Sequence, residues 1–179
     1  MNHEIAAEGI TALRARIFTF GADAAQPIHH PDGLVVMRGG LIERVGDYAE
    51  IAPLLDPAVR VTDHRPNIVM AGFIDPHLHM PQTQVIASYG TELLDWLSKY
   101  TFPEESRYHD RAVCDAASRF LLDTLLRNGT TTAAAYCTSH PQSVESLFEE
   151  AARRNMRITA GKVMMDRNAP ASLTDTPER

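Results

Sequence analysis

Two histidines separated by one residue, His77 and His79, are the side chains of this sequence best suited to bind a metal. They follow an apolar run, residues 68–74, whose length and composition predict a fully buried strand. In extended backbone, side chains two residues apart point to the same face, so both imidazoles would converge at the carboxyl end of this strand. Because imidazole nitrogen is a common zinc ligand, the spacing predicts a metal site there.

The pair taken alone is a weak signal, because the chain has eight histidines and so short a motif also arises by chance. A polar strand end without a metal is therefore the alternative. The position favours the metal site, since parallel barrels carry their chemistry at the carboxyl ends of the strands. Gln82, five residues past His77, offers a hydrogen-bond donor and an acceptor that suit the edge of a purine. The alternative is an exposed loop glutamine that does not bind a substrate.

The segment AGFIDPHLH, residues 71–79, resembles the signature of the amidohydrolase superfamily, in which both histidines bind the catalytic metal. The loop PQTQVIASYGTELLDWLSKYTFPEE, residues 81–105, is very similar to the corresponding loop of the guanine deaminase family. RNGTTTAAAY (residues 127–136) and GKVMMDRN (residues 161–168) continue this resemblance. This sequence departs from the superfamily signature at two positions: Ala71 stands where the superfamily usually has proline, and Pro76 precedes the first histidine. Because proline lacks an N–H, Pro76 predicts a bulge or the end of regular pairing.

The resemblance implies an α/β fold: the N-terminal part of a (β/α)8 TIM-type amidohydrolase barrel, preceded by a small β-sandwich segment. It implies one zinc ion per complete subunit, with His77 and His79 as metal ligands and Gln82 in contact with guanine. The implied reaction is hydrolytic deamination of guanine to xanthine and ammonia, in purine catabolism. Lys162 raises the possibility of a carboxylated lysine that bridges two metals. The guanine deaminase branch is expected to hold one metal, which gives Lys162 a structural or supporting role.

Hydrophobic periodicity predicts the elements that would position these residues. Residues 1–66 read as short strands and turns, with a hairpin over residues 33–46 that turns at Gly39-Gly40. After the His-x-His strand, the pattern predicts helices over residues 91–100, 110–128 and 143–155, and strands over residues 130–137 and 157–165. This alternation favours a parallel sheet. The expected domains are an N-terminal β-sandwich segment, 1–66, and the first two βα units and third strand of an incomplete barrel, 67–179.

Several residues that could do chemistry have simpler interpretations. His29, His30 and His64 fall in turn-rich stretches and read as solvated histidines, and His140 reads as a loop histidine or a helix-cap neighbour. Trp96, the only tryptophan, would either pack the loop helix against the barrel or line the pocket.

Length and composition limit the remaining possibilities. A complete barrel needs about 250 residues, so this 179-residue chain is expected to be part of a longer enzyme, with the catalytic acid/base residues and the remaining ligands beyond Arg179. The net charge of −6 gives no general basic field for nucleic acid. Two cysteines and no long apolar run favour a cytoplasmic protein without a membrane partner, and a homodimer is possible. The alternatives are another amidohydrolase, a deaminase or chlorohydrolase of a different heterocycle, or an inactive fragment or interaction module.

Overall fold

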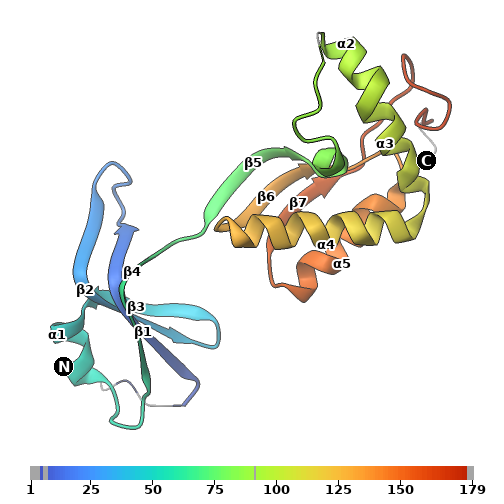
Figure 1. Cartoon of the computed structure of the whole chain (residues 1–179). Helices are drawn as coiled ribbons and strands as arrows, with labels where there is room; N and C mark the ends of the chain where they lie inside the picture. The colour runs from blue at the N-terminus through green and yellow to red at the C-terminus, as the bar shows by residue number, and fades with distance from the viewer. Residues whose placement is uncertain (1–4, 6–7, 91, 177–179) are drawn as a thin grey trace. The chain divides into compact units, whose positions relative to one another are not determined.

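The computed structural model describes residues 5, 8–90 and 92–176, and the chain forms two compact units, Met1–Ala71 and Gly72–Arg179 (Figure 1). Each unit has its own sheet and its own buried core. Among the described residues, no helix combines the length and the apolarity that a membrane span requires. Each unit is therefore described by itself.

The first unit is a four-stranded sheet with the order β3-β2-β1-β4. Its strands are β1 (Ile10–Phe20), β2 (Pro27–Arg38), β3 (Leu41–Asp47) and β4 (Val61–Met70), and α1 (Tyr48–Ile51) and η1 (Ala52–Leu54) follow β3. The predicted hairpin is confirmed, because β2 and β3 pair antiparallel and Gly39 and Gly40 both have positive φ angles, as its two-residue turn requires. The described residues of this unit form one sheet, so the β-sandwich stays a prediction.

The second unit is a three-stranded parallel sheet covered by two helices on one face (Figure 1). The strands β5 (Phe73–His79), β6 (Thr130–Tyr136) and β7 (Arg157–Gly161) lie in chain order, and α4 (Arg111–Arg127) and α5 (Pro141–Arg153) connect them. The predicted β-α-β-α-β alternation is confirmed. Whether the sheet belongs to a complete barrel stays a prediction.

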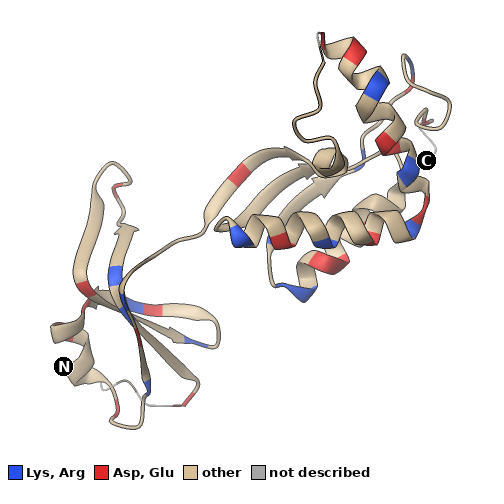
Figure 2. Ribbon diagram, viewed as in Figure 1, with Lys and Arg blue, Asp and Glu red and all other residues tan. Residues whose placement is uncertain are grey.

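The ends and outer faces of α4 and α5 follow local rules. Asp110 is the N-cap of α4, and its carboxylate accepts a hydrogen bond from the Ala112 N–H at 2.8 Å. Pro141 occupies the first turn of α5, where its missing N–H costs nothing. Acidic and basic residues alternate along α4 (Figure 2), and Arg111 binds both Asp115 within α4 and Glu149 on α5 at 2.7 Å. These ion pairs tie the solvent side of the two helices together.

A long excursion between β5 and α4 contains more helix than the sequence predicts. It comprises η2 (Met80–Gln84), α2 (Leu93–Trp96), a π-helical turn η3 (Leu97–Thr101), α3 (Phe102–Ser106) and η4 (Arg107–His109). The predicted helix began at Thr91, which lies outside the described residues, and its predicted end at Tyr100 is wrong. The π turn lies directly before α3, where Pro103 cannot donate a backbone hydrogen bond.

Two strand predictions are wrong. The apolar run 68–74 is not one buried strand: its first part ends β4, its second part begins β5, and Ile74 is 71% exposed. At the break, a Cβ on Gly72 would come within 2.2 Å of the Thr131 hydroxyl oxygen, so the chain passes too close to β6 for a side chain. The predicted strand 157–165 ends at Gly161, opposite Tyr136 at the end of β6, although two backbone hydrogen bonds, from Cys137 N–H to Gly161 O and from Val163 N–H to Thr138 O, continue beyond it.

Candidate functional site

His77 and His79 lie together at the carboxyl end of β5, with their ring centroids 5.2 Å apart. The register of β5 against β6 shifts between Asp75 and Leu78, which confirms the irregularity predicted at Pro76. In this bulge the Asp75 carboxylate accepts a hydrogen bond from the His77 N–H at 3.0 Å. The two imidazoles thus lie close together even though the backbone between Asp75 and Leu78 is irregular.

Tyr136 joins the two histidines from the neighbouring strand. It ends β6 in register with His79, and its ring stacks on that imidazole at 4.9 Å and meets the edge of His77 at 5.4 Å. Tyr136 was not among the site residues predicted from the sequence, although its place at the end of a predicted strand was a usable signal. The three rings form a partly exposed aromatic group at the edge where parallel sheets carry ligands.

Gln82 lies in η2, one turn beyond the histidines. Its Nε2 is 3.3 Å from Nδ1 of His79, and its side chain is also a hydrogen-bond partner of Glu105 in α3. Glu105 is only 7% exposed, and burial raises the pKa of its carboxyl group to about 7, although the hydrogen bond from Gln82 opposes this rise. The structure thus brings a titratable group near neutrality to the predicted substrate residue, one that the sequence analysis did not identify.

The loop that carries these groups is fastened at both ends. The Tyr108 hydroxyl in η4 donates a hydrogen bond to the Pro81 carbonyl at 3.4 Å, and Tyr108 is fully buried. Burial raises the pKa of the Tyr108 phenol, so it stays protonated and remains a donor. Pro81 immediately precedes Gln82, so this contact fixes the backbone of the residue whose side chain meets Glu105.

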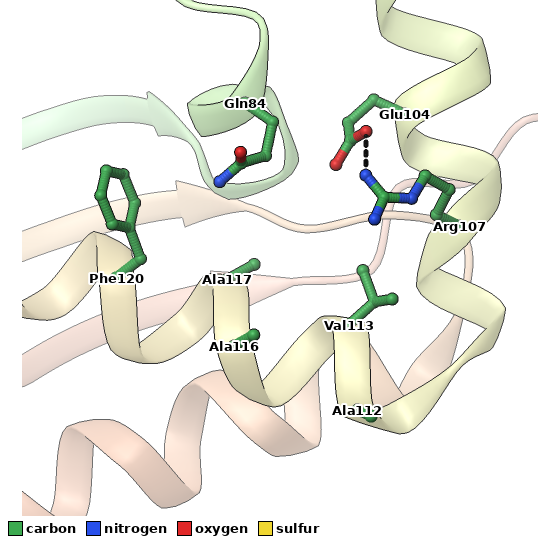
Figure 3. Close-up of a pocket in the computed structure, with 8 residues that line it drawn as sticks. All are labelled: Gln84, Glu104, Arg107, Ala112, Val113, Ala116, Ala117 and Phe120. Atoms are coloured by element: carbon green, nitrogen blue, oxygen red, sulfur yellow. Dashed lines mark hydrogen bonds and ion pairs between the residues drawn. The ribbon is translucent and has the colours of Figure 1, made fainter.

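Two shallow hollows flank the histidines. One, of about 330 Å³, is lined by His77, Tyr136 and Lys162, and the other, of about 350 Å³, by His77, His79 and Gln82. A separate pocket of about 410 Å³ lies between η2, α3 and α4 (Figure 3), where Arg107 donates to Glu104 at 2.7 Å above small apolar residues of α4. The predicted site residues belong to the two hollows and not to this pocket.

The imidazole nitrogens of His77 and His79 fit part of a metal site. Burial, and then the neighbouring His77, lower the pKa of His79, which favours the neutral imidazole that binds metals. Two imidazole nitrogens fall short of the three protein ligands that a catalytic zinc usually has. Within the described ranges, no group of three or more His, Cys, Asp or Glu residues is placed to hold a metal. His77 and His79 are therefore the candidate ligands that the described residues offer.

Other candidates have structural roles in the described residues. Lys162, just beyond β7, forms an ion pair with the buried Asp175. His140 is the N-cap residue of α5, without a capping hydrogen bond from its side chain, and burial lowers its pKa. The indole of Trp96 donates to the Ser88 carbonyl at 3.1 Å and so closes the loop on itself. His140 and Trp96 line neither of the two hollows, whereas Lys162 lines one of them together with His77.

Comparisons with known proteins place this geometry in a family context. Residues 68–179 match the model of the Amidohydrolase family. The chain is 48% identical to the guanine deaminase of Escherichia coli (strain K12) over 147 residues, which cover 82% of this chain and 34% of that protein. The chain spans about a third of the length of the curated relatives that it matches.

Solved structures agree with this relationship. The guanine deaminase of Bradyrhizobium japonicum superposes with a TM-score of 0.89 at 44% identity, over 94% of this chain and 38% of that one. A guanine deaminase from C. acetobutylicum, solved with guanine in its active site, gives a TM-score of 0.80 at 28% identity, over 93% of this chain and 39% of that one. An adenosine deaminase from Xanthomonas campestris, solved with bound zinc, shares the fold, with a TM-score of 0.72 at 19% identity over 91% of this chain and 36% of that one.

Proposed function

Because this chain belongs to the amidohydrolase family, we propose that it is the N-terminal part of a zinc-dependent guanine deaminase. The observation that carries the proposal is the His77–His79 pair at the end of a parallel strand, with Gln82 3.3 Å from His79, in a chain 48% identical to a guanine deaminase. The overall reaction adds water to guanine at C2 and releases ammonia and xanthine.

In this proposal each described residue has one task. His77 and His79 hold the zinc ion, which when bound lowers the pKa of water so that a nucleophile is available near neutral pH. Gln82 orients the purine through its amide, which can donate and accept hydrogen bonds. Tyr136 keeps both imidazoles in place by ring contacts. The remaining ligands and the acid/base residues would come from later strands of the complete barrel.

The finer points of the proposal concern the whole enzyme. They are one zinc ion per complete subunit, a (β/α)8 barrel with an adjoining β-sandwich over residues 1–66, a possible homodimer and a cytoplasmic location. The parallel β5-β6-β7 sheet and the likeness to guanine deaminases support the barrel, and the His77–His79 pair supports the zinc site. The β-sandwich segment and the barrel correspond to the predicted domains, residues 1–66 and 67–179.

The test measures conversion of guanine to xanthine, together with zinc content, for the protein that carries this sequence and for His77→Ala. The expected result is zinc-dependent xanthine formation that His77→Ala abolishes together with stoichiometric zinc. His29→Ala, which removes an exposed histidine of the first unit, is the matched control and should leave both unchanged.

Two outcomes would contradict the proposal. Turnover of a triazine, an adenine derivative or an imidazolone, with guanine left intact, would identify a different amidohydrolase. Retention of zinc and activity in His77→Ala would remove the histidine pair from the chemistry and favour a scaffold role for β5.

A further inference from the structure

Glu105 is a buried carboxyl group whose neighbour in sequence has a different environment. Glu104 forms an ion pair with Arg107, whereas the hydrogen-bond partner of Glu105 is Gln82. Burying a carboxyl group is costly unless a hydrogen bond compensates, and the hydrogen bond from Gln82 compensates only in part, since the pKa of Glu105 remains raised to about 7. The fold therefore tolerates an unfavourable group at this position.

The contact constrains the Gln82 amide. Only the nitrogen of a primary amide can donate a hydrogen bond, so Nε2 of Gln82 faces the Glu105 carboxylate. Nε2 is also 3.3 Å from Nδ1 of His79. A primary amide has one donor atom and one acceptor atom, so with its nitrogen engaged on this side Gln82 has its carbonyl oxygen Oε1 left to accept a hydrogen bond from a substrate.

The backbone around Glu105 is also fixed. Thr101, Glu105 and Tyr108 are all buried and lie on one face of the continuous helical segment, at spacings of four and three residues. Tyr108 bonds to the Pro81 carbonyl, so Glu105 and Tyr108 hold the side chain and the backbone at Gln82 respectively.

We propose that Glu105 is a positioning residue that orients the Gln82 amide, so that its carbonyl oxygen receives an N–H donor of the purine. This inference rests on the proposed function and deepens it. Glu105 itself contacts neither the base nor the metal in this assignment; it selects the orientation in which Gln82 meets the substrate. A base edge that lacks an N–H donor is then disfavoured, since the oxygen would remain unpaired.

The kinetic test is a double-mutant cycle between Gln82→Ala and Glu105→Ala in the zinc-loaded protein, with guanine as substrate. Glu105→Ala should raise KM about tenfold, the factor that ordering a free glutamine side chain costs, and change kcat less than about threefold. In the Gln82→Ala background the same substitution should change KM less than about twofold. Glu105→Gln, which keeps an acceptor for Gln82, should restore KM to within about threefold of the unsubstituted protein.

Additive effects in the cycle, or a fall in kcat with KM unchanged, would overturn the positioning role. A second measurement needs no turnover: NMR titration of the Glu105 carboxyl in the unsubstituted protein and in Gln82→Ala. Loss of the hydrogen bond should raise its pKa further, and an unchanged value would overturn the coupling. If this coupling is present but guanine is not deaminated, the proposed function fails and the Gln82–Glu105 contact stands. Glu104→Ala, which alters the neighbouring carboxyl paired with Arg107, is the control for both experiments.

Discussion

Replacing Glu105 by glutamine should remove a large part of the pH dependence of unfolding in the second unit. Burial raises the pKa of Glu105 from 4.5 to about 7. Because this pKa is raised in the folded state, the folded chain binds more protons than the unfolded chain between these two values. The stability contribution of Glu105 is therefore fully present below about pH 4.5 and is lost as the pH rises through 7.

The size of the effect follows from the shift. A difference of about 2.5 pKa units corresponds to about 3 kcal/mol over the whole window, of which about 2.5 kcal/mol falls between pH 5 and pH 8.5. Glu105 is 7% exposed, so solvent screens little of this. Glutamine has nearly the same volume and no charge at any pH. The Glu105→Gln protein should therefore gain stability, relative to the unsubstituted protein, as the pH rises.

The assay is urea unfolding followed by the fluorescence of Trp96, the only tryptophan, which lies in the same loop as Glu105. The quantity of interest is the difference in free energy of unfolding between the two proteins at pH 5 and at pH 8.5, since the other titrating groups cancel in that difference. Glu104→Gln is the control, because it removes the neighbouring carboxyl group. It shows whether loss of any carboxyl from this helix changes the pH dependence of the free energy of unfolding. A Glu105→Gln difference that stays within about 0.5 kcal/mol between the two pH values would refute the argument.

Two further predictions concern the packing of the second unit. Leu147→Ala should lower the free energy of unfolding by about 3 kcal/mol, because Leu147 is fully buried in the core, whereas Phe148→Ala, at a neighbouring position 43% exposed, should cost clearly less. Equal losses in urea unfolding would contradict the assignment of the buried face of α5. Asp110→Ala should cost about 1 kcal/mol through loss of the N-cap bond to Ala112, whereas Asp110→Asn, which keeps an acceptor, should lose little by circular dichroism melting.

Much of the second unit could be predicted from local signals. The apolar repeat through α4 and the β-branched run of β6 each act over a few residues, and the structure confirms these two elements and the order of the strands. The irregularity at Pro76 was also predictable, because a missing N–H is a property of one residue.

What the sequence could not reveal depends on contacts between distant residues. Composition alone makes residues 68–74 look like one strand, since the close approach of Gly72 to Thr131 appears only when β5 lies beside β6. Glu104 and Glu105 are adjacent carboxylates in sequence, and only the fold shows that Glu104 pairs with Arg107 whereas Glu105 meets Gln82. Tyr136 became a site residue through its register with His79, which a strand prediction does not contain.

The position of Gln82 depends on residues more than twenty places along the chain. Met80 and Tyr108 belong to the same buried cluster as the inner faces of α4 and α5, and Tyr108 and Glu105 then hold Pro81 and Gln82. Gln82 therefore has contacts on two elements, His79 at the end of β5 and Glu105 in α3. Because β5 and the helical segment α3–η4 are separate supports, substitutions in α3 should alter binding of the base while leaving the histidine pair intact. Under the proposed function, such substitutions should therefore separate orientation of the substrate from binding of the metal.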